Sequence, residues 1–180
     1  MLEEIQTVTY KNQLIALYNA ANPELPHQLT DSDIKFSVAT ANTGNKNSKV
    51  TMTALEGSEN FKGEIELQYD RLEPGVVGRI ELTDDLSRWV EQNELRAWLQ
   101  LYLTKVKPTD MVAPDDVTYS TEDQKDEHEK ITLRTVTCTV NAGHLKYKEG
   151  VMATFVITPK AVDNRIDLAT TNGELDGFTA

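Results

Sequence analysis

The sequence predicts an α+β fold made of a tandem pseudo-repeat, in which each unit is one helix packed on antiparallel β-strands. Three observations support this prediction: short motifs recur in the same order, each half has one helical apolar pattern, and alternating segments follow each helix. The two units are expected over residues 8–78 and 84–160, and an extended C-terminal arm over 165–180. The pattern leaves open whether the two units form one domain or two.

The recurring motifs keep their order along the chain, and their spacing drifts by only a few residues. Four pairs align at offsets between 81 and 86 residues: 12–17 with 93–98, 33–37 with 116–120, 49–52 with 130–133, and 61–62 with 147–148. Each match is weak alone, so it is the retained order that indicates a repeat.

Apolar residues at helical spacing predict one helix in each unit. The two apolar faces are Leu14, Leu17, Tyr18 and Ala21 in the first unit, and Leu95, Trp98, Leu99 and Tyr102 in the second. We expect these faces to be buried against sheet residues such as Ile65, Leu67 and Phe155. Prolines at positions 23 and 108 are expected to end the helices.

A period of two predicts half-buried strands after each helix. The alternating segments are 34–38, 50–54 and 65–69 in the first unit, and 117–119, 131–140 and 151–157 in the second. Turn residues at 57–60 and 141–143 predict hairpins. A strand near residues 79–82 is expected to close the first unit. The apolar phase switches between Leu133 and Val136, which indicates a β-bulge or a mixed environment.

Composition excludes several classes of protein. The 180 residues carry a net charge of −11, which disfavours binding to nucleic acid or to an anionic membrane surface. No apolar run approaches the roughly 20 residues that span a bilayer. The acidic start of the sequence lacks the features of a secretory signal, and the single cysteine, Cys138, excludes an internal disulfide. We therefore expect a soluble acidic protein made in a reducing compartment.

The sequence predicts no catalytic, cofactor-binding or metal-binding residue. His27, His128 and His144 fall in expected loops or turns, without the short helical spacing of metal ligands. The acidic run at residues 122–129 lacks the glycine and the ligand spacing of a calcium loop, so we interpret it as a solvated hairpin.

The remaining reactive side chains also have structural interpretations. Acidic residues at 31–33 and at 115–116 directly precede expected strands, where carboxylates form side-chain-to-backbone turns. Cys138 lies in a strand pattern without a nearby base, so we interpret it as a small packed residue.

Assembly contacts are expected at a few apolar residues. Trp98 belongs to the apolar face of the second helix, whereas Trp89 either packs internally or marks a subunit contact. The C-terminal arm has little apolar content to hold it to its own unit, so a neighbouring subunit is the expected source of its contacts. The expected contact residues are Leu168, Leu175, Phe178 and Trp89.

Three segments carry a family resemblance: a leucine-threonine-aspartate entry to a strand within 25–36, a lysine-glycine strand ending in Tyr69-x-Arg71 within 61–72, and the ending at 171–178. Together they resemble an uncharacterised domain found in virion structural proteins of large tailed bacteriophages. The resemblance covers most of the chain, its motifs are structural, and it assigns no functional residue. The second unit departs from the pattern because it has no tyrosine-x-arginine exit.

The resemblance implies a non-enzymatic virion structural protein, an assembly subunit of the tail, neck or baseplate that needs no cofactor. Its expected partners are other virion proteins and copies of itself, with no direct contact to nucleic acid or membrane. Its expected location is the virion, after assembly in the host bacterial cytoplasm. A capsid decoration protein is an alternative. A small carbohydrate- or receptor-binding module is another, because β-surfaces that bear aromatic residues can bind sugars.

Overall fold

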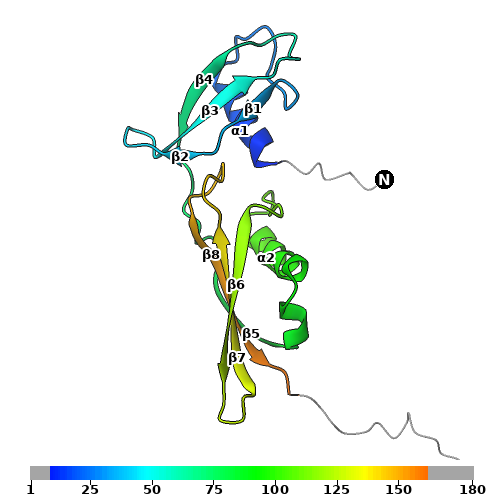
Figure 1. Ribbon diagram of the computed structural model, residues 1–180. Helices are drawn as coiled ribbons and strands as arrows, with labels where there is room; N and C mark the ends of the chain where they lie inside the picture. The colour runs from blue at the N-terminus through cyan, green and yellow to red at the C-terminus, as the bar shows by residue number, and fades with distance from the viewer. Residues whose placement is uncertain (1–8, 162–180) are drawn as a thin grey trace, which may run out of the picture.

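The computed structural model describes residues 9–161, which form two lobes lying end to end (Figure 1). The first lobe contains α1 (Tyr10–Ala21), β1 (Ile34–Phe36), β2 (Thr40–Ala41), β3 (Ser48–Ala54) and β4 (Glu64–Tyr69). The second contains β5 (Gly78–Asp84), the short 3-10 helix η1 (Leu86–Trp89), α2 (Gln92–Val106), β6 (Val117–Lys125), β7 (Ile131–Val140) and β8 (Gly150–Pro159). The predicted α+β class is confirmed.

Each lobe has its own four-stranded sheet. In the first lobe, β3 pairs antiparallel with β1 and β2 on one side and with β4 on the other. In the second lobe the order is β5-β8-β7-β6, and β6, β7 and β8 form an antiparallel meander. In the first lobe β1 and β2 thus lie along one edge of β3, whereas each strand of the second lobe's meander pairs with the next.

Strand β5 corrects one expectation about the first unit. The segment near residues 79–82 was expected to close that unit, but β5 pairs in parallel with β8 along its whole length, from Gly78 beside Ala153 to Asp84 beside Pro159. The pairing is parallel because the chain crosses over through η1 and α2 before it returns to the same sheet. The strand therefore belongs to the second lobe, and the boundary between the lobes lies between β4 and β5.

Side chains cap the starts of α1 and η1, whereas Glu91 at the start of α2 makes no side-chain cap bond. The Thr9 hydroxyl accepts a hydrogen bond from the Asn12 N–H at 3.2 Å, and the Asp85 carboxylate accepts one from the Ser87 N–H at 2.9 Å. The short η1 precedes α2, which begins at Gln92.

The loops after the two helices are held in the same way. The Asn19 side chain donates to the Leu29 carbonyl at 2.9 Å and accepts from the Leu29 N–H at 3.0 Å. Gln100 of α2 donates to the Asp110 carbonyl at 2.9 Å and accepts from the Val112 N–H at 2.8 Å. Each amide thus satisfies backbone groups of an irregular segment, which would otherwise lose their hydrogen bonds on burial.

The predicted aspartate turns before the strands are confirmed. Asp33 accepts a hydrogen bond from the N–H of Thr30 at 2.9 Å, directly before β1. Asp116 accepts one from the N–H of Ala113 at 2.7 Å, directly before β6. In both cases the carboxylate accepts a bond from the N–H three residues earlier, so it fixes the turn from which the next strand starts.

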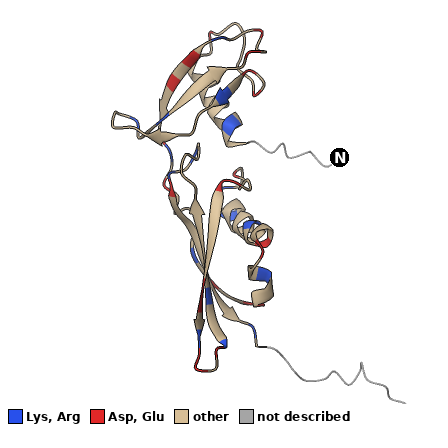
Figure 2. Ribbon diagram, viewed as in Figure 1, with Lys and Arg blue, Asp and Glu red and all other residues tan. Residues whose placement is uncertain are grey.

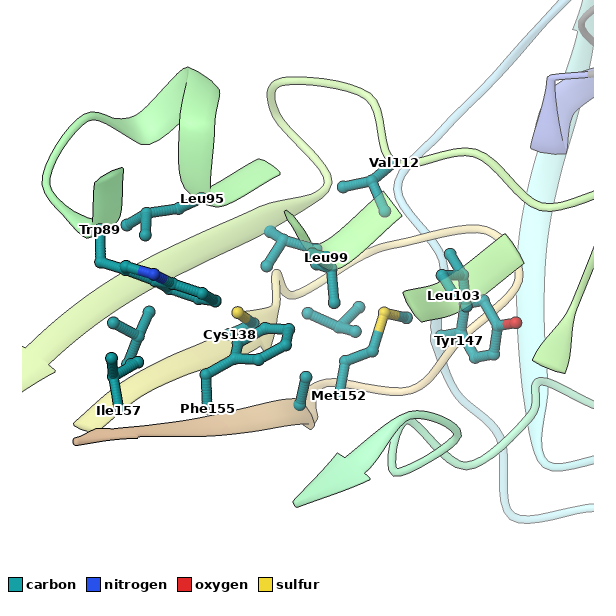
Figure 3. Packing of buried hydrophobic residues seen from close by; sticks show 14 residues of the cluster. Trp89, Leu95, Leu99, Leu103, Val112, Cys138, Tyr147, Met152, Phe155 and Ile157 are labelled. Atoms are coloured by element: carbon teal, nitrogen blue, oxygen red, sulfur yellow. The ribbon is translucent and has the colours of Figure 1, made fainter. Parts of the chain in front are cut away.

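The larger hydrophobic core belongs to the second lobe. Figure 3 shows leucines of α2 facing residues of β7 and β8, with Trp89 closing one end of the cluster and Tyr147 the other. Fourteen residues are buried in this cluster. Leu95 and Leu99 are buried as predicted, and both belong to the cluster that contains Phe155. At about 1.5–3 kcal/mol for each large apolar side chain, this cluster supplies most of the apolar stabilisation of the chain.

The core of the first lobe is smaller and differs from the expected helix face. It contains four buried residues, Ile15, Leu29, Ile34 and Met52. Leu14 is buried as predicted, but Leu17 is 63% exposed and Ile65 of β4 is 48% exposed, so the expectation that both are buried is wrong. The face of α1 turned to the sheet includes Ile15 and Tyr18, because the short strands of this lobe cover only part of the helix.

The irregularity expected in β7 lies further along the strand. Its register with β8 shifts between Cys138 and Thr139, not between Leu133 and Val136. The apolar pattern changes before Val136 because residues 131–135 do not alternate between buried and exposed. Four of them are half-buried, and one is exposed.

Candidate functional site

The two lobes meet at a joint formed by the chain between β4 and β5 and the connection between β7 and β8. Leu72 forms a parallel bridge with Tyr147, in which the Leu72 N–H donates to the Lys146 carbonyl and the Lys148 N–H donates to the Leu72 carbonyl, both at 2.9 Å. The Ala39 N–H adds a third backbone bond to the Gly143 carbonyl at 3.0 Å. Backbone hydrogen bonds therefore connect the lobes from both sides of β3.

The Tyr69-x-Arg71 exit crosses this joint. The Tyr69 hydroxyl donates to the Leu145 carbonyl at 2.7 Å, and the Arg71 guanidinium donates to the His144 carbonyl at 3.2 Å. The Arg71 Nε also donates to the hydroxyl of buried Ser48 at 2.7 Å. The motif therefore has a structural role in connecting the two lobes.

A buried polar cluster lies beneath these backbone contacts. The carboxylate of Asp110, only 1% exposed, accepts a hydrogen bond from the Tyr147 hydroxyl and lies 2.5 Å from the Lys146 Nζ. The same Nζ donates to the Gln13 side chain of α1 at 2.8 Å. Burial first, and the bond to Asp110 second, raise the pKa of Tyr147 well above its usual value.

His144 is held at the centre of the joint. Its Nδ1 accepts hydrogen bonds from the N–H groups of Lys146 and Tyr147, both at 3.0 Å, and its Nε2 lies 3.7 Å from Asp116. Because Nδ1 accepts, the neutral ring carries its proton on Nε2. Burial is the main reason that its pKa is lowered to about 4, and the Arg71 charge adds to it. These two hydrogen bonds fix the neutral ring and occupy Nδ1, so this nitrogen is not free to accept a proton from a substrate.

Tyr10 connects α1 to this cluster. Its ring packs edge-on against His144 and against Tyr147, with centroid distances of 4.5 Å and 6.1 Å. Two hollows border the ring, one of about 210 Å³ towards Leu17 and Tyr69, and one of about 370 Å³ towards Met111 and Asp116. The groups that could react face inward and are bonded to each other, so the joint is built to hold the lobes in place.

A second feature lies along the outer edge of β4. One side of β4 pairs with β3, and no described strand pairs with its other side. Ile65, Leu67 and Tyr69 alternate on the face of β4 that is turned to α1, and Leu17 and Leu72 stand beside them. Hollows of about 170 Å³ at the Ile65 end and about 210 Å³ at the Tyr69 end border this row. We call these five residues the open strip: Leu17, Ile65, Leu67, Tyr69 and Leu72.

The structure corrects one predicted assembly contact and leaves three outside its range. Trp89 has no exposed surface, stacks on Trp98 at 4.9 Å and donates through its indole N–H to Asp84 at 3.0 Å. It packs internally, so its expected role as a subunit contact is wrong; the turn from η1 to α2 folds it over the second core. Leu168, Leu175 and Phe178 lie outside the described residues 9–161.

The other side chains weighed for chemistry have structural surroundings. The acidic run forms the end of β6 and its hairpin to β7, which is coloured mostly red in Figure 2. There Asp126 accepts hydrogen bonds from the N–H groups of His128 and Lys130, and Asp123 pairs with Arg134. Cys138 is buried, which raises the pKa of its thiol to about 12. Within residues 9–161, no three His, Cys, Asp or Glu side chains gather as metal ligands would.

Comparison with known proteins assigns no activity. Residues 4–80 match the model of a family of unknown function, DUF7941. This match spans the first lobe and the start of β5, less than half of the chain. No curated protein and no solved structure matches the chain. None of the described helices is long and apolar enough to cross a membrane.

Sequence reasoning missed both features of the site. Asp110 and Lys146 lie far apart in the sequence, and nothing in their local patterns predicts that they meet. The alternation of Ile65 and Leu67 predicts a half-buried strand with both side chains in the core, so it does not indicate an open strip. These side chains are left partly exposed because β4 lies at the edge of its sheet. The alternation of residues within one strand does not show which strands lie beside it.

Proposed function

We propose that this chain is a non-enzymatic structural subunit of a bacteriophage virion, placed in the tail, neck or baseplate and assembled with copies of itself. The observation that carries the assembly role is the open strip. Its apolar side chains lie on the core side of a sheet edge whose backbone has no described partner, and such edges readily pair with another chain. A subunit interface would cover both the side chains and the backbone groups.

The joint supports a mechanical role. The hydrogen bond from Lys146 to Gln13, the packed ring of Tyr10 and three backbone hydrogen bonds cross between the lobes. Contacts of this number and kind hold two lobes in one orientation, whereas a freely hinged pair would meet through a small wet surface. A subunit of a rigid particle needs a fixed orientation because each copy sets the position of the next.

The tandem pseudo-repeat is part of this proposal. Asn19 and Gln100 clamp the loops after their helices, and Asp33 and Asp116 form the same turn before the first strand. The pairs are 81 and 83 residues apart, which agrees with the offsets of the sequence motifs. Strand β5 has no counterpart in the first lobe among the residues that the structure describes.

The resemblance of three sequence segments is the support for a virion, and no second observation favours a particular part of the particle. A carbohydrate-binding module receives less support, because the aromatic residues of the described strands are already packed: Phe36, Tyr119 and Phe155 on the two cores, and Tyr69 in the joint. A sugar site needs an aromatic face free to stack. A capsid decoration protein differs only in position, which the first experiment below reports.

The first experiment asks whether the chain is in the particle. Virions of the phage that encodes it are purified on a density gradient, and their proteins are quantified by mass spectrometry. The proposal predicts a constant number of copies per particle, and antibody labelling at the tail, neck or baseplate. Labelling over the capsid surface would favour the decoration protein instead. A chain found only in the lysate of infected cells would show that the virion proposal is wrong.

The second experiment tests the open strip. Sedimentation velocity is measured over a range of concentrations for the wild type, for Leu17→Lys and for Leu101→Lys. Leu17 and Leu101 are both exposed, at 63% and 49%, but Leu101 lies on α2, away from the strip. We expect Leu17→Lys to weaken self-association at least tenfold and Leu101→Lys to leave it unchanged. Equal effects of the two variants would remove the strip from the interface.

A further inference from the structure

The two lobes differ at one sheet edge, and the difference identifies what is missing from the first lobe. In the second lobe, β8 is the last strand of the meander and β5 covers its outer edge, so Met152, Phe155 and Ile157 are fully or almost fully buried. In the first lobe, β4 is the last strand of the meander and its outer edge lacks a described partner. Ile65 is left 48% exposed on the core side of that edge.

From this difference, and resting on the proposed assembly role and pseudo-repeat, we infer that residues 162–180 of a second copy lie along the open strip as the missing edge strand. The arm would take the place at β4 that β5 takes at β8. Its apolar side chains would fill the hollows at the two ends of the strip, and its backbone would pair with the free edge of β4. These apolar residues are Ile166, Leu168, Leu175 and Phe178.

The residues before α1 are a poorer occupant. Counted from the first residue of each helix, Gln92 and Tyr10, the lobes are offset by 82 residues. At that offset, residues 4–7 correspond to η1 rather than to β5. They therefore correspond to the connection that leads into the helix, not to the strand that covers the sheet edge.

The path of the chain favours a second copy over the same copy. The strand β8 starts at the joint and runs away from the first lobe for ten residues, about 33 Å, so the arm starts at the far end of the molecule (Figure 1). Nineteen residues reach at most about 65 Å when fully extended. To reach its own strip, an arm would spend half of that length lying taut along the second lobe. When a second copy approaches end to end, its arm starts beside the strip and uses none of its extended length to cross a lobe.

Charge offers this occupant one contact, at the Ile65 end of the strip. The arm carries four acidic residues, Asp163, Asp167, Glu174 and Asp176, against the single Arg165. The hollow beside Ile65 is bordered by Glu64 and by Lys62, and Lys62 forms no ion pair with any described residue. An acidic residue of the arm placed on the Lys62 side of the hollow supplies that partner. Because each copy then offers an arm at one end and a strip at the other, the contact is head to tail and builds rings or filaments.

The test uses disulfide trapping in the full chain. Ile65→Cys and Phe178→Cys are made as separate variants, mixed, and oxidised under mild conditions. The natural Cys138 does not interfere, because it is fully buried. We expect a disulfide-linked heterodimer on a non-reducing gel, and at least tenfold less of it when Leu101→Cys replaces Ile65→Cys as the acceptor. A Lys62→Glu substitution in the acceptor should lower the yield further.

Three results would overturn the inference. One is an equal yield with the Leu101→Cys acceptor. Another is a bond within one chain in the double variant Ile65→Cys/Phe178→Cys at high dilution. The third is a bond within one chain in Ile5→Cys/Ile65→Cys, which would place the residues before α1 on the strip.

The outcome separates this inference from the proposed function. If trapping fails while the wild type still associates in sedimentation and Leu17→Lys weakens that association, the strip is an interface but the arm is not its occupant. If the wild type is also absent from purified particles, the proposed function itself is wrong.

Discussion

The ring of Tyr10, at the start of α1, packs edge-on against the ring of His144, within the β7–β8 connection, with 4.5 Å between the ring centroids. This contact joins the helix of one lobe to a loop of the other. Burial, with the Asp110 charge adding to it, raises the pKa of Tyr10 above its usual value, so the phenol is neutral at pH 7. The orientation of the lobes thus depends on a packed pair of neutral rings above a buried ion pair.

Removing the cation of that ion pair should be costly. Lys146→Met leaves the carboxylate of Asp110 buried, with the Tyr147 hydroxyl but no positive charge beside it. We expect the free energy of unfolding to fall by about 3 kcal/mol, because an uncompensated buried charge is strongly destabilising. Urea unfolding at pH 7 measures this change. The control is Lys125→Met, which breaks an exposed pair with Glu129 and should cost less than about 0.5 kcal/mol.

Two leucines of the predicted helix faces should respond in opposite ways. Leu99 of α2 has no exposed surface, and Leu99→Ala should cost about 2–5 kcal/mol by creating a cavity. Leu17 of α1 is 63% exposed, and Leu17→Ala should change the stability of the monomer by less than about 0.5 kcal/mol. Thermal melts at low protein concentration compare the two. A large loss for Leu17→Ala in the monomer would restore the helix face that the sequence predicted.

The sequence predicts the helices and strands of this fold better than it predicts which strands pair with each other. Helical spacing locates both helices, and the aspartate turns at Asp33 and Asp116 follow from carboxylates placed before alternating segments. These features depend on residues a few positions apart, so local physics determines them. The partner of β5 depends instead on how the chain crosses over through α2. The alternating pattern near residue 80 is compatible with a strand in the first sheet and with a strand in the second.

The site is less predictable for the same reason. Trp89 and Leu17 are both large apolar residues in helical segments, yet one is completely buried and the other mostly exposed. The difference is set by how far the sheet extends beneath each helix, because strands of ten residues in the second lobe cover α2, whereas the three residues of β1 do not cover α1. Such coverage is a property of the assembled lobe, and no short window of sequence contains it.

Gly143 at the joint should not tolerate a side chain. Its φ is +81°, and a Cβ atom at this position would lie 2.8 Å from the Cβ of Val38 in the first lobe. We expect Gly143→Ala to cost about 1–3 kcal/mol in unfolding free energy and to increase proteolysis between the lobes. Gly57→Ala is the control, because a Cβ there meets no atom within 4 Å. Equal stability of the two variants would mean that the loop moves away from Val38 without cost.

The stability of the joint should fall as the pH is lowered through the range set by His144. Its pKa is about 4 in the folded protein, mainly because of burial, and about 6.5 when the chain is unfolded. Between these values the unfolded chain binds a proton that the folded chain does not, so unfolding becomes easier as pH falls. The stabilisation is complete above about pH 6.5 and is lost progressively down to about pH 4, a change on the order of 3 kcal/mol. Urea unfolding every half pH unit measures it. His144→Asn keeps a carbonyl acceptor for the two backbone N–H groups and should flatten the slope in this window, while His128→Gln, in an exposed hairpin, should leave it unchanged. An unaltered slope in His144→Asn would show that other groups control the acid sensitivity.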